Sequence, residues 1–515
     1  MRDFLKNEKN EFLAFVQKAK FLLVITIFFM ILSYGIKLFY FDFSIDTEAI
    51  LDDYPQQMDN WLNVNRLGLV FTKYLLFHHR FNPFVANILT FFTFTIVCYF
   101  LSYLVHRILG PVSKSAGMFI LPILFLTHPI FAEQFNFTLQ NFEVALGILF
   151  QVLALLLTYY YTQKNYIIFP VVAIVLNIWS FLTYQALYSF FITGAVVSIL
   201  LILCRDQKES QPRAFSGYLV IILKYSLIYL LSFILAQLLA ITYTKIMHIP
   251  SGTYLTRQIL WGKLPTSEVI QEIQKQLSTV FFAKNASFYN YGFIISTILV
   301  LFIFIKKIVK RVPDIYLEIF VFLVLYLSPF LLTIIIGQGE AIRAQMPALE
   351  LVIAFNFYYV YWSLHNHWLR KALVTYCLIL AFNQSYAAAN LLFSEHVKYK
   401  EDVTLANRMN VQLDNLGVGD RADYSLVILG KHEPESVVVL PGETLGRSFF
   451  AWDIGTRAGT TYRAIGFMRI LGYPFHRPTS KQLDYAHSIE KELTVWPKKD
   501  SIRIHGNLIV IKLSN

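Results

Sequence analysis

Long apolar segments constrain this chain more than any other feature of its sequence. A helix that crosses the ~30 Å hydrocarbon core of a bilayer needs about twenty mostly apolar residues, because lipid offers no partner to an open backbone. Eleven such segments occur, at residues 20–40, 84–105, 115–131, 142–161, 166–181, 184–204, 217–243, 289–306, 315–336, 346–364 and 371–392. The sequence therefore predicts a polytopic α-helical membrane protein with about 11 transmembrane helices.

Composition separates the membrane part, residues 21–392, from a C-terminal domain, residues 393–515. The whole chain is 56% hydrophobic and 15% charged, whereas soluble domains carry roughly 25% charge, so a soluble enzyme is excluded. Residues 395–515 hold 16 Lys/Arg and 14 Asp/Glu in 121 positions, an ordinary globular composition. Three strand-like runs and one helix-like run predict a small α/β domain there: Tyr424 to Leu429, Ser436 to Leu440, Ile502 to Leu513, and Lys481 to Leu493.

Basic residues alternate between the loops, and their distribution predicts the orientation of the chain. Short cytoplasmic loops of membrane proteins are enriched in Lys and Arg. If residues 1–20 are a cytoplasmic amphipathic segment, six inner segments hold 17 Lys and Arg, and the short outer loops hold one, Arg343. An odd number of spans then places the C-terminal domain outside the cell, with two long outer loops, 41–83 and 244–288. Because the net charge of +11 follows from this orientation, no nucleic-acid partner is expected.

The start of the chain and its cysteines argue against a signal peptide and against a fold held by disulfides or zinc. The apolar run from Phe21 to Phe41 is long and has no small-residue cleavage pattern, so it is interpreted as a retained first span and not as a signal peptide. Cys98, Cys204 and Cys377 lie within or at the edges of apolar segments, and they form no disulfide framework and no zinc motif.

Two stretches of the long outer loops are amphipathic. Apolar residues recur at helical spacing from Ser267 to Lys284 and from Tyr54 to Phe77. Both stretches are therefore expected to be helices that lie at the outer membrane surface.

The densest polar cluster of the membrane part lies in the first outer loop. Six acids fall within eighteen residues: Asp42, Asp46, Glu48, Asp52, Asp53 and Asp59. A carboxylate near a reacting carbon can act as a general base toward a hydroxyl acceptor. Asp46 and Glu48 are favoured, because a helix terminus beside the apolar end would hold them at the headgroup level. The alternative is a solvated acidic loop, and the sequence leaves both interpretations open.

Polar side chains at the ends of other spans converge on the same outer surface. They are Glu133, Gln140, Glu143, Tyr184, Gln185, Glu340 and Arg343. The planar guanidinium of Arg343 is suited to pair two phosphate oxygens. Its alternative roles are a snorkelling anchor or an ion pair with Glu340.

Six short motifs follow one another along the membrane part. They are FSIDTE (43–48), NRLGLVFTKYLL (65–76), Asn82-Pro83, EQFNF (133–137), WSFLTYQALYSFF (179–191) and GEAIRAQMP (339–347). In their order, and in their shared place on the predicted outer side of the membrane, these motifs resemble those of the bacterial glucosyltransferases that decorate O-antigen and related surface polymers. These glucosyltransferases are polytopic enzymes of the GT-C class. The resemblance covers roughly Phe21 to Leu392.

The resemblance implies a hexosyltransferase of the bacterial cytoplasmic membrane, with glucose as the expected sugar. The donor would be a polyprenyl-phosphate-linked sugar, since nucleotide sugars do not occur outside the cell. The acceptor would be a surface polysaccharide or a teichoic-acid-like polymer, and membrane lipids surround the enzyme. In GT-C enzymes an acid of the first outer loop serves at the catalytic centre, and the matching positions here are Asp46 and Glu48.

The same resemblance assigns the binding residues. Arg343 would hold the donor phosphate, and the further substrate-binding candidates are Arg66, Glu133, Tyr184, Gln185 and Glu340. The glycine that precedes the arginine of the family motif is Asn65 here, which puts the role of Arg66 in doubt. Some GT-C members use a divalent cation. The crowded carboxylates leave Mg²⁺ or Mn²⁺ open, but no ligand spacing requires either ion.

Two other function classes compete with the transferase. A lipid or polysaccharide transporter, such as a flippase, would show inverted repeats, interrupted helices and polar residues at the membrane midplane. A membrane scaffold would bind a surface partner through its C-terminal domain and tolerate substitutions in the outer loops. The sequence shows no internal repeat, which favours the transferase.

Overall fold

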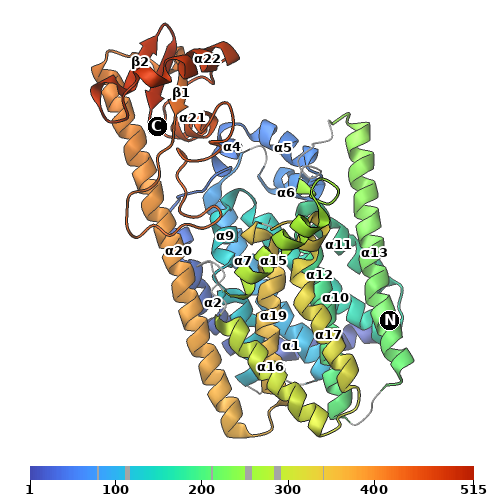
Figure 1. Cartoon of the computed structure of the whole chain (residues 1–515). Coiled ribbons are helices and arrows are strands. Elements are labelled where there is room, and N and C mark those ends of the chain that lie inside the picture. Colours follow the sequence, from blue (N-terminus) through green and yellow to red (C-terminus); the bar gives the residue numbers. More distant parts are fainter. Residues whose placement is uncertain (78–79, 111–115, 210–212, 250–257, 283–290, 340) are drawn as a thin grey trace.

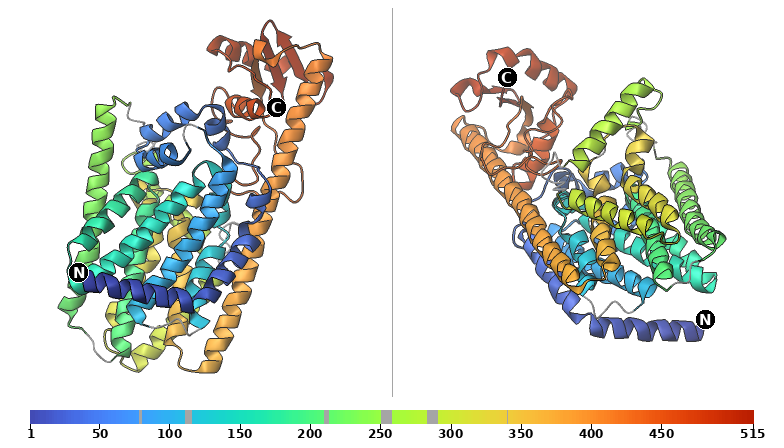
Figure 2. Two further views of the ribbon diagram at one scale, coloured as in Figure 1. Left: turned by 180° about the vertical axis from the view of Figure 1, so that it is seen from behind. Right: turned by 60° about the horizontal axis from the view of Figure 1, so that its bottom comes forward.

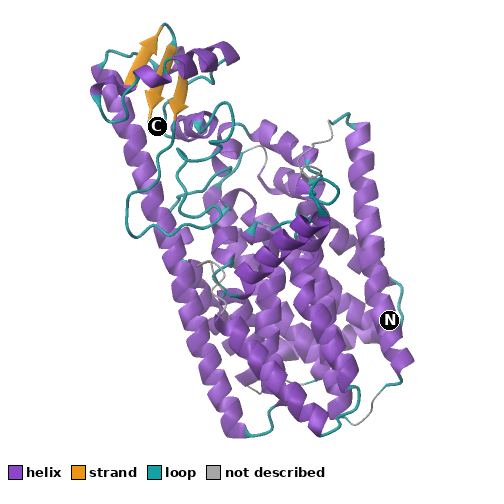
Figure 3. Cartoon of the chain, viewed as in Figure 1, coloured by secondary structure: helices purple, strands orange, loops and turns teal. Residues whose placement is uncertain are grey.

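A bundle of long helices carries a small domain at one end (Figure 1). The structure, a computed structural model, describes residues 1–515 except 78–79, 111–115, 210–212, 250–257, 283–290 and 340. Figure 3 shows the strands gathered in the small domain, while the bundle is helical.

Each of the eleven predicted segments contains a helix of the bundle. These helices are α2 (Lys20–Tyr34), α3 (Ile36–Phe39), α7 (Pro83–Leu109), α8 (Ile120–Thr127), α10 (Asn141–Lys164), α11 (Ile168–Thr183), α12 (Leu187–Lys208), α13 (Phe215–Ile246), α16 (Tyr291–Val309), α17 (Ile315–Leu327), α18 (Leu331–Ile336), α19 (Ile342–Ser363) and α20 (His367–Asn415). Among the described residues, seven helical segments are long and apolar enough to cross a membrane, or eight if the bent pair at the N-terminus is one span. The chain is thus a multi-pass membrane protein, and α8, α11 and α19 are the three predicted spans that fall short of this test.

Burial distinguishes the centre of the bundle from its rim. The most apolar stretch of α12 is 89% buried, whereas that of α13 is 28% buried. A helix that is apolar all round is stable in either place, because its side chains meet other helices in the centre and lipid at the rim. Figure 1 accordingly shows α13 at the edge of the bundle.

The N-terminal helix α1 (Arg2–Lys18) lies across the bundle instead of joining it. It meets α2 at an angle of 62°. Glu8 of α1 pairs with Arg107 and accepts a hydrogen bond of 2.6 Å from the hydroxyl of Tyr160, which ties α1 to α7 and α10. Because α1 is amphipathic, this position is typical of a helix in the plane of a membrane surface.

Short helices cover the end of the bundle that faces the small domain. They are α4 (Thr47–Asp52), α5 (Tyr54–Asn63), α6 (Leu67–Phe77), α9 (Phe131–Asn136) and α15 (Thr266–Phe281). Helix α15 confirms the amphipathic helix expected from Ser267, although Lys284 lies outside the described residues. One continuous helix from Tyr54 to Phe77 is wrong, because Asn65 adopts a left-handed conformation with φ of 61° and separates α5 from α6.

The C-terminal domain grows directly from the last helix of the bundle. Helix α20 has 49 residues and passes without a break through position 392, where the membrane part was expected to end. Strands β1 (Ser425–Leu429), β3 (Leu508–Lys512) and β2 (Ile502–His505) form a sheet in that order, with β1 parallel and β2 antiparallel to β3. Helices α21 (Thr461–Ile470) and α22 (Ser480–Ser488) pack beside it, so the predicted small α/β domain is confirmed.

One predicted strand of this domain, Ser436 to Leu440, is wrong. The backbone N–H of Leu440 donates to Ser394 Oγ of α20 at 2.6 Å, and Val437 is 98% exposed. The segment therefore runs along α20 and does not join the sheet, because its polar groups find partners on the helix.

Candidate active site

The first outer loop meets the C-terminal domain at Asp46. This residue precedes α4 and has a φ of 68°, a left-handed conformation that Asp tolerates better than most residues. Helix α21 brings Arg463 against the turn, so that Arg463 Nη1 lies 2.6 Å from Asp46 Oδ1 and 3.0 Å from Glu48 Oε1. On its other side, Arg463 Nε donates to Asp453 at 2.7 Å. One guanidinium thus joins three carboxylates from two parts of the chain.

The two first-loop carboxyls differ in their surroundings. Glu48 is 2% exposed, and its Oε2 has no hydrogen-bond partner among the described residues. Burial, partly offset by Arg463 and reinforced by Asp46, raises the pKa of Glu48 to about 8. The side chain of Asp46 is 37% exposed. At neutral pH, Glu48 is therefore mostly protonated and enclosed, whereas Asp46 is accessible.

Asp46 borders a cavity of about 500 Å³ at this end of the bundle, hereafter the central cavity. Its polar lining is Asp46, Arg66, Gln140, Tyr184, Gln185, Gln258, Gln338, Arg343 and Arg463. Leu332 and Ile336 close it on the side of α18. The neighbouring side chains of Ile334 and Ile335 are 42% and 54% exposed, so the cavity lies beside an apolar surface.

Arg66 enters the central cavity because of the break between α5 and α6. Its Nη1 donates to Gln140 Oε1 at 3.0 Å and its Nε to Gln185 Oε1 at 3.4 Å. The guanidinium also lies 5.0 Å from the centre of the Tyr184 ring. Three expected binding residues are thereby brought into direct contact, since the left-handed turn at Asn65 aims Arg66 inward.

Arg343 reaches the same cavity from the start of α19. It lies 3.6 Å above the Phe137 ring and donates to Glu443 Oε1 of the C-terminal domain through Nη2 at 2.7 Å and Nε at 3.1 Å. Stacking and the paired bonds fix the orientation of the guanidinium.

Glu133 holds the segment that carries Glu443. It accepts hydrogen bonds from the backbone N–H groups of Glu443 at 2.6 Å and Thr444 at 2.9 Å, and from the Thr444 hydroxyl at 2.7 Å. Burial and the neighbouring Glu443 raise the pKa of Glu133 to about 7, against the effect of these bonds. Glu133 is thus used to dock the C-terminal domain, and it does not line the central cavity.

A second cavity, of about 410 Å³, adjoins the first and is hereafter the acidic cavity. Its lining holds five carboxylates, two guanidiniums, three side-chain amides and one phenol: Asp46, Glu48, Asp52, Asp53, Asp453, Arg463, Arg477, Gln56, Gln57, Asn60 and Tyr462. Asp46 and Arg463 border both cavities, so they form the wall between them.

A comparison with protein families identifies the family of this chain. A family model described as glucosyl transferase GtrII matches residues 35–363. The chain belongs to this family. It is a membrane glucosyltransferase, and the resemblance drawn from its motifs is confirmed. No curated protein and no solved structure matches the chain. The transporter and scaffold alternatives are set aside, because family membership assigns a transferase activity.

Most of the site residues expected from the sequence meet in this GtrII-family chain. Asp46, Arg66, Tyr184, Gln185 and Arg343 all line the central cavity, and each lies within the matched region. Glu48 lines the acidic cavity instead. Glu340 lies outside the described residues. An ion pair with Glu340 was one alternative role for Arg343. In the described part of the chain, Arg343 forms an ion pair with Glu443.

The contribution of the C-terminal domain to the candidate site was not predicted from the sequence. Arg463, Asp453 and Glu443 complete the site from beyond the region that the family model matches. A signal was available in the charges, because six clustered acids require basic partners when they are buried. Five arginines occur from Arg447 to Arg477, and this stretch supplies Arg463, the partner of Asp46 and Glu48.

The first-loop carboxylates do not fit a divalent cation in the arrangement observed. Asp46 and Glu48 both direct an oxygen at the same guanidinium nitrogen of Arg463. Among the described residues, no group of three or more His, Cys, Asp or Glu side chains could hold a metal ion.

Proposed function

We propose that this GtrII-family enzyme transfers glucose from a polyprenyl-phosphate-linked donor to a surface glycan, in the manner of GT-C enzymes. The observation that carries the proposal is the position of Asp46, which borders two cavities at once. One cavity would hold the donor and the other the acceptor. A base between them is where a transfer reaction needs it.

The lining of the central cavity supports a lipid-linked donor. Arg66 and Arg343 can bind a phosphate from two sides, and Tyr184, Gln140 and Gln185 offer a ring face and amides to a sugar. The exposed isoleucines of α18 beside the cavity would contact the polyprenyl chain in the bilayer.

The reaction follows from these positions. The acceptor hydroxyl attacks C1 of glucose while the bond between C1 and the phosphate oxygen breaks, and the proton of the hydroxyl passes to Asp46. The released polyprenyl phosphate keeps the electron pair of the broken bond, and Arg66 and Arg343 stabilise its charge. Arg463 Nη1 lies 2.6 Å from Asp46 Oδ1 and so fixes the position of this carboxyl group at the wall between the two cavities.

The acidic cavity supports an uncharged acceptor. With Glu48 protonated, four acidic side chains still outnumber the two guanidiniums there, so a phosphate-rich polymer such as a teichoic acid would be repelled. Carboxylates, amides and the Tyr462 ring are suited to the hydroxyl groups and faces of neutral sugars. We therefore expect a neutral surface polysaccharide at this position.

The distribution of basic residues supports the orientation. The ends of α12 and α16 and the start of α20 carry lysines and arginines at the end of the bundle remote from the C-terminal domain. Under the positive-inside rule this end faces the cytoplasm. The opposite end, which carries the central cavity and the C-terminal domain, then lies outside, where the donor must be lipid-borne.

The proposal is tested by glucose transfer with the purified chain in detergent. Labelled polyprenyl-phosphate glucose is offered with a glycan acceptor, and UDP-glucose is the control donor. We expect wild type to transfer glucose from the lipid donor, with release of polyprenyl phosphate, and not from UDP-glucose. Asp46→Asn should abolish this transfer. Asp59→Asn is the matched control, because Asp59 is an exposed acid of the same loop outside both cavities. Equal use of UDP-glucose, or full activity of Asp46→Asn, would contradict the proposal.

The acceptor is tested with one oligosaccharide in neutral and phosphorylated forms. The acidic cavity predicts that the neutral form accepts glucose at a higher kcat/KM, and that added salt narrows the difference by screening repulsion. Preference for the phosphorylated form would show that the acceptor binds elsewhere.

A further inference from the structure

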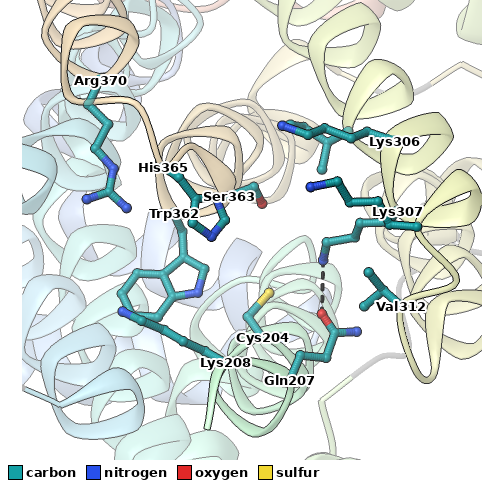
Figure 4. A pocket seen from close by; sticks show the side chains of 12 residues that line it. Cys204, Gln207, Lys208, Lys306, Lys307, Val312, Trp362, Ser363, His365 and Arg370 are labelled. Carbon is teal, nitrogen blue, oxygen red and sulfur yellow. Dashed lines mark hydrogen bonds between the residues drawn. The ribbon is translucent and has the colours of Figure 1, made fainter. Parts of the chain in front are cut away.

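A second concentration of charge lies at the opposite end of the bundle from the active site. A cavity of about 290 Å³ opens there between the ends of α12, α16 and α19 and the start of α20. Five of its lining residues are basic: Lys208, Lys306, Lys307, Lys310 and Arg370. Figure 4 shows Arg370 on one side and Lys306 and Lys307 on the other, with Trp362 and His365 between them.

Only part of this charge is compensated by the protein. Lys307 lies 2.7 Å from Glu318, but no carboxylate lines the cavity among the residues that the structure describes. Lys208 lies 4.0 Å from the centre of the Trp362 ring. The Nε atom of Arg370 is buried and has no hydrogen-bond partner within the described chain. Like charges gathered in this way favour an anion between them.

The surroundings favour an anion that belongs to a lipid. Lys306 and Lys310 follow the lipid-facing side of α16, where Phe302, Ile305 and Val309 are 64%, 61% and 77% exposed. A ligand with acyl or prenyl chains can place those chains against this apolar surface while its head group enters the cavity. A free phosphate ion would gain only the charge interactions.

We propose that this cavity binds the phosphate head group of a membrane lipid. Lys306, Lys310 and Arg370 contact the phosphate, and Trp362 lines the cavity between the arginine and the lysines of α16. The site is separate from the active site and independent of the function proposed for it. In the orientation proposed above, it serves the cytoplasmic leaflet, where basic pockets between helices recognise anionic head groups.

The test uses the full-length chain in detergent, with lipid binding measured by native mass spectrometry and by the shift of Tm. The probes are dioctanoyl phosphatidylglycerol, farnesyl phosphate, inorganic phosphate and, as the zwitterionic control, dioctanoyl phosphatidylcholine. We expect the two lipid phosphates to bind more tightly than the other two probes. Tighter binding of phosphatidylglycerol would identify a bulk phospholipid as the source, and tighter binding of farnesyl phosphate a prenyl carrier.

The variants locate the site. Lys306→Gln combined with Lys310→Gln removes two exposed charges with no ion pair among the described residues, so folding should be preserved, and lipid affinity should fall about tenfold or more. Arg370→Gln should have a similar effect. Lys371→Gln is the matched control, because Lys371 is the exposed neighbour of Arg370 outside the cavity. Unchanged affinity in the double variant, or inorganic phosphate binding as tightly as the lipids, would overturn the proposal.

Discussion

Replacing Glu48 by glutamine separates the roles of the two first-loop carboxyls. Glu48 is enclosed and has a pKa of about 8, whereas Asp46 borders both cavities. Glutamine has nearly the shape of a protonated glutamic acid and can accept the same bond from Arg463. Glu48→Gln should therefore leave the site intact near pH 7, while Asp46→Asn removes the proposed base.

The pH dependence of stability follows from the same pKa. The pKa of Glu48 is about 8 in the folded chain against 4.5 for the free side chain. Because the folded value is the higher one, protonation of Glu48 stabilises the fold fully below pH 4.5, and this contribution is lost as the pH rises through about 8. At about 1.4 kcal/mol per pH unit, the loss in free energy of unfolding amounts to at most about 5 kcal/mol.

The assay compares the Tm of wild type and Glu48→Gln in detergent between pH 5 and pH 9.5. We expect similar Tm values at pH 5 and a wild-type Tm that falls below that of the variant as the pH rises. Transfer at pH 7 should stay within a few-fold of wild type in Glu48→Gln and be lost in Asp46→Asn. Parallel Tm curves would refute the reasoning on burial, and equal loss of transfer in both variants would refute the division of roles.

Three further substitutions test other parts of the account. Arg66→Ala removes a proposed phosphate contact and should lower kcat/KM for the lipid donor about 10- to 100-fold, with a fall in Tm because the bonds to Gln140 and Gln185 are also lost; an unaltered kcat/KM would exclude the phosphate contact. Glu133→Gln weakens charge-assisted bonds to the segment that carries Glu443, so the free energy of unfolding should fall by about 1.5–3 kcal/mol and proteolysis of the C-terminal domain should speed up, whereas unchanged proteolysis would contradict the docking role. Gly68→Ala places a methyl group 2.7 Å from the backbone oxygen of Trp179 and should lower stability by about 1–3 kcal/mol, while Gly455→Ala, with no atom within 4 Å, should change neither Tm nor transfer.

The helices could be predicted from the sequence, but their interruptions could not. Apolar length alone located a helix in every predicted span, because lipid leaves the backbone few alternatives. The break at Asn65 depends on one residue that adopts a left-handed conformation, and no periodicity reveals it. The segment from Ser436 to Leu440 has the composition of a strand, yet a hydrogen bond to Ser394 of α20 decides its path.

The residues of the candidate active site could likewise be predicted from the sequence only in part. Polar residues at the ends of different spans were expected to converge on one surface, which is why Tyr184, Gln185 and Arg343 could be grouped in advance, whereas Arg66 was assigned through the family resemblance. Arg463 lies 417 positions from Asp46, and only the docking of the C-terminal domain brings the two together. The sequence predicted a domain outside the membrane, but it did not predict that this domain completes the site.

The most direct test of the central claim is photo-crosslinking with a polyprenyl-phosphate glucose that carries a photoreactive group on the sugar, followed by mapping of the labelled peptides. The account predicts labels around the central cavity, in residues 137–140, 184–186 or 341–344. Labelling should be lost when an excess of unlabelled donor competes. Competable labels at the basic cavity at the opposite end of the bundle, with none around Asp46, would contradict the account.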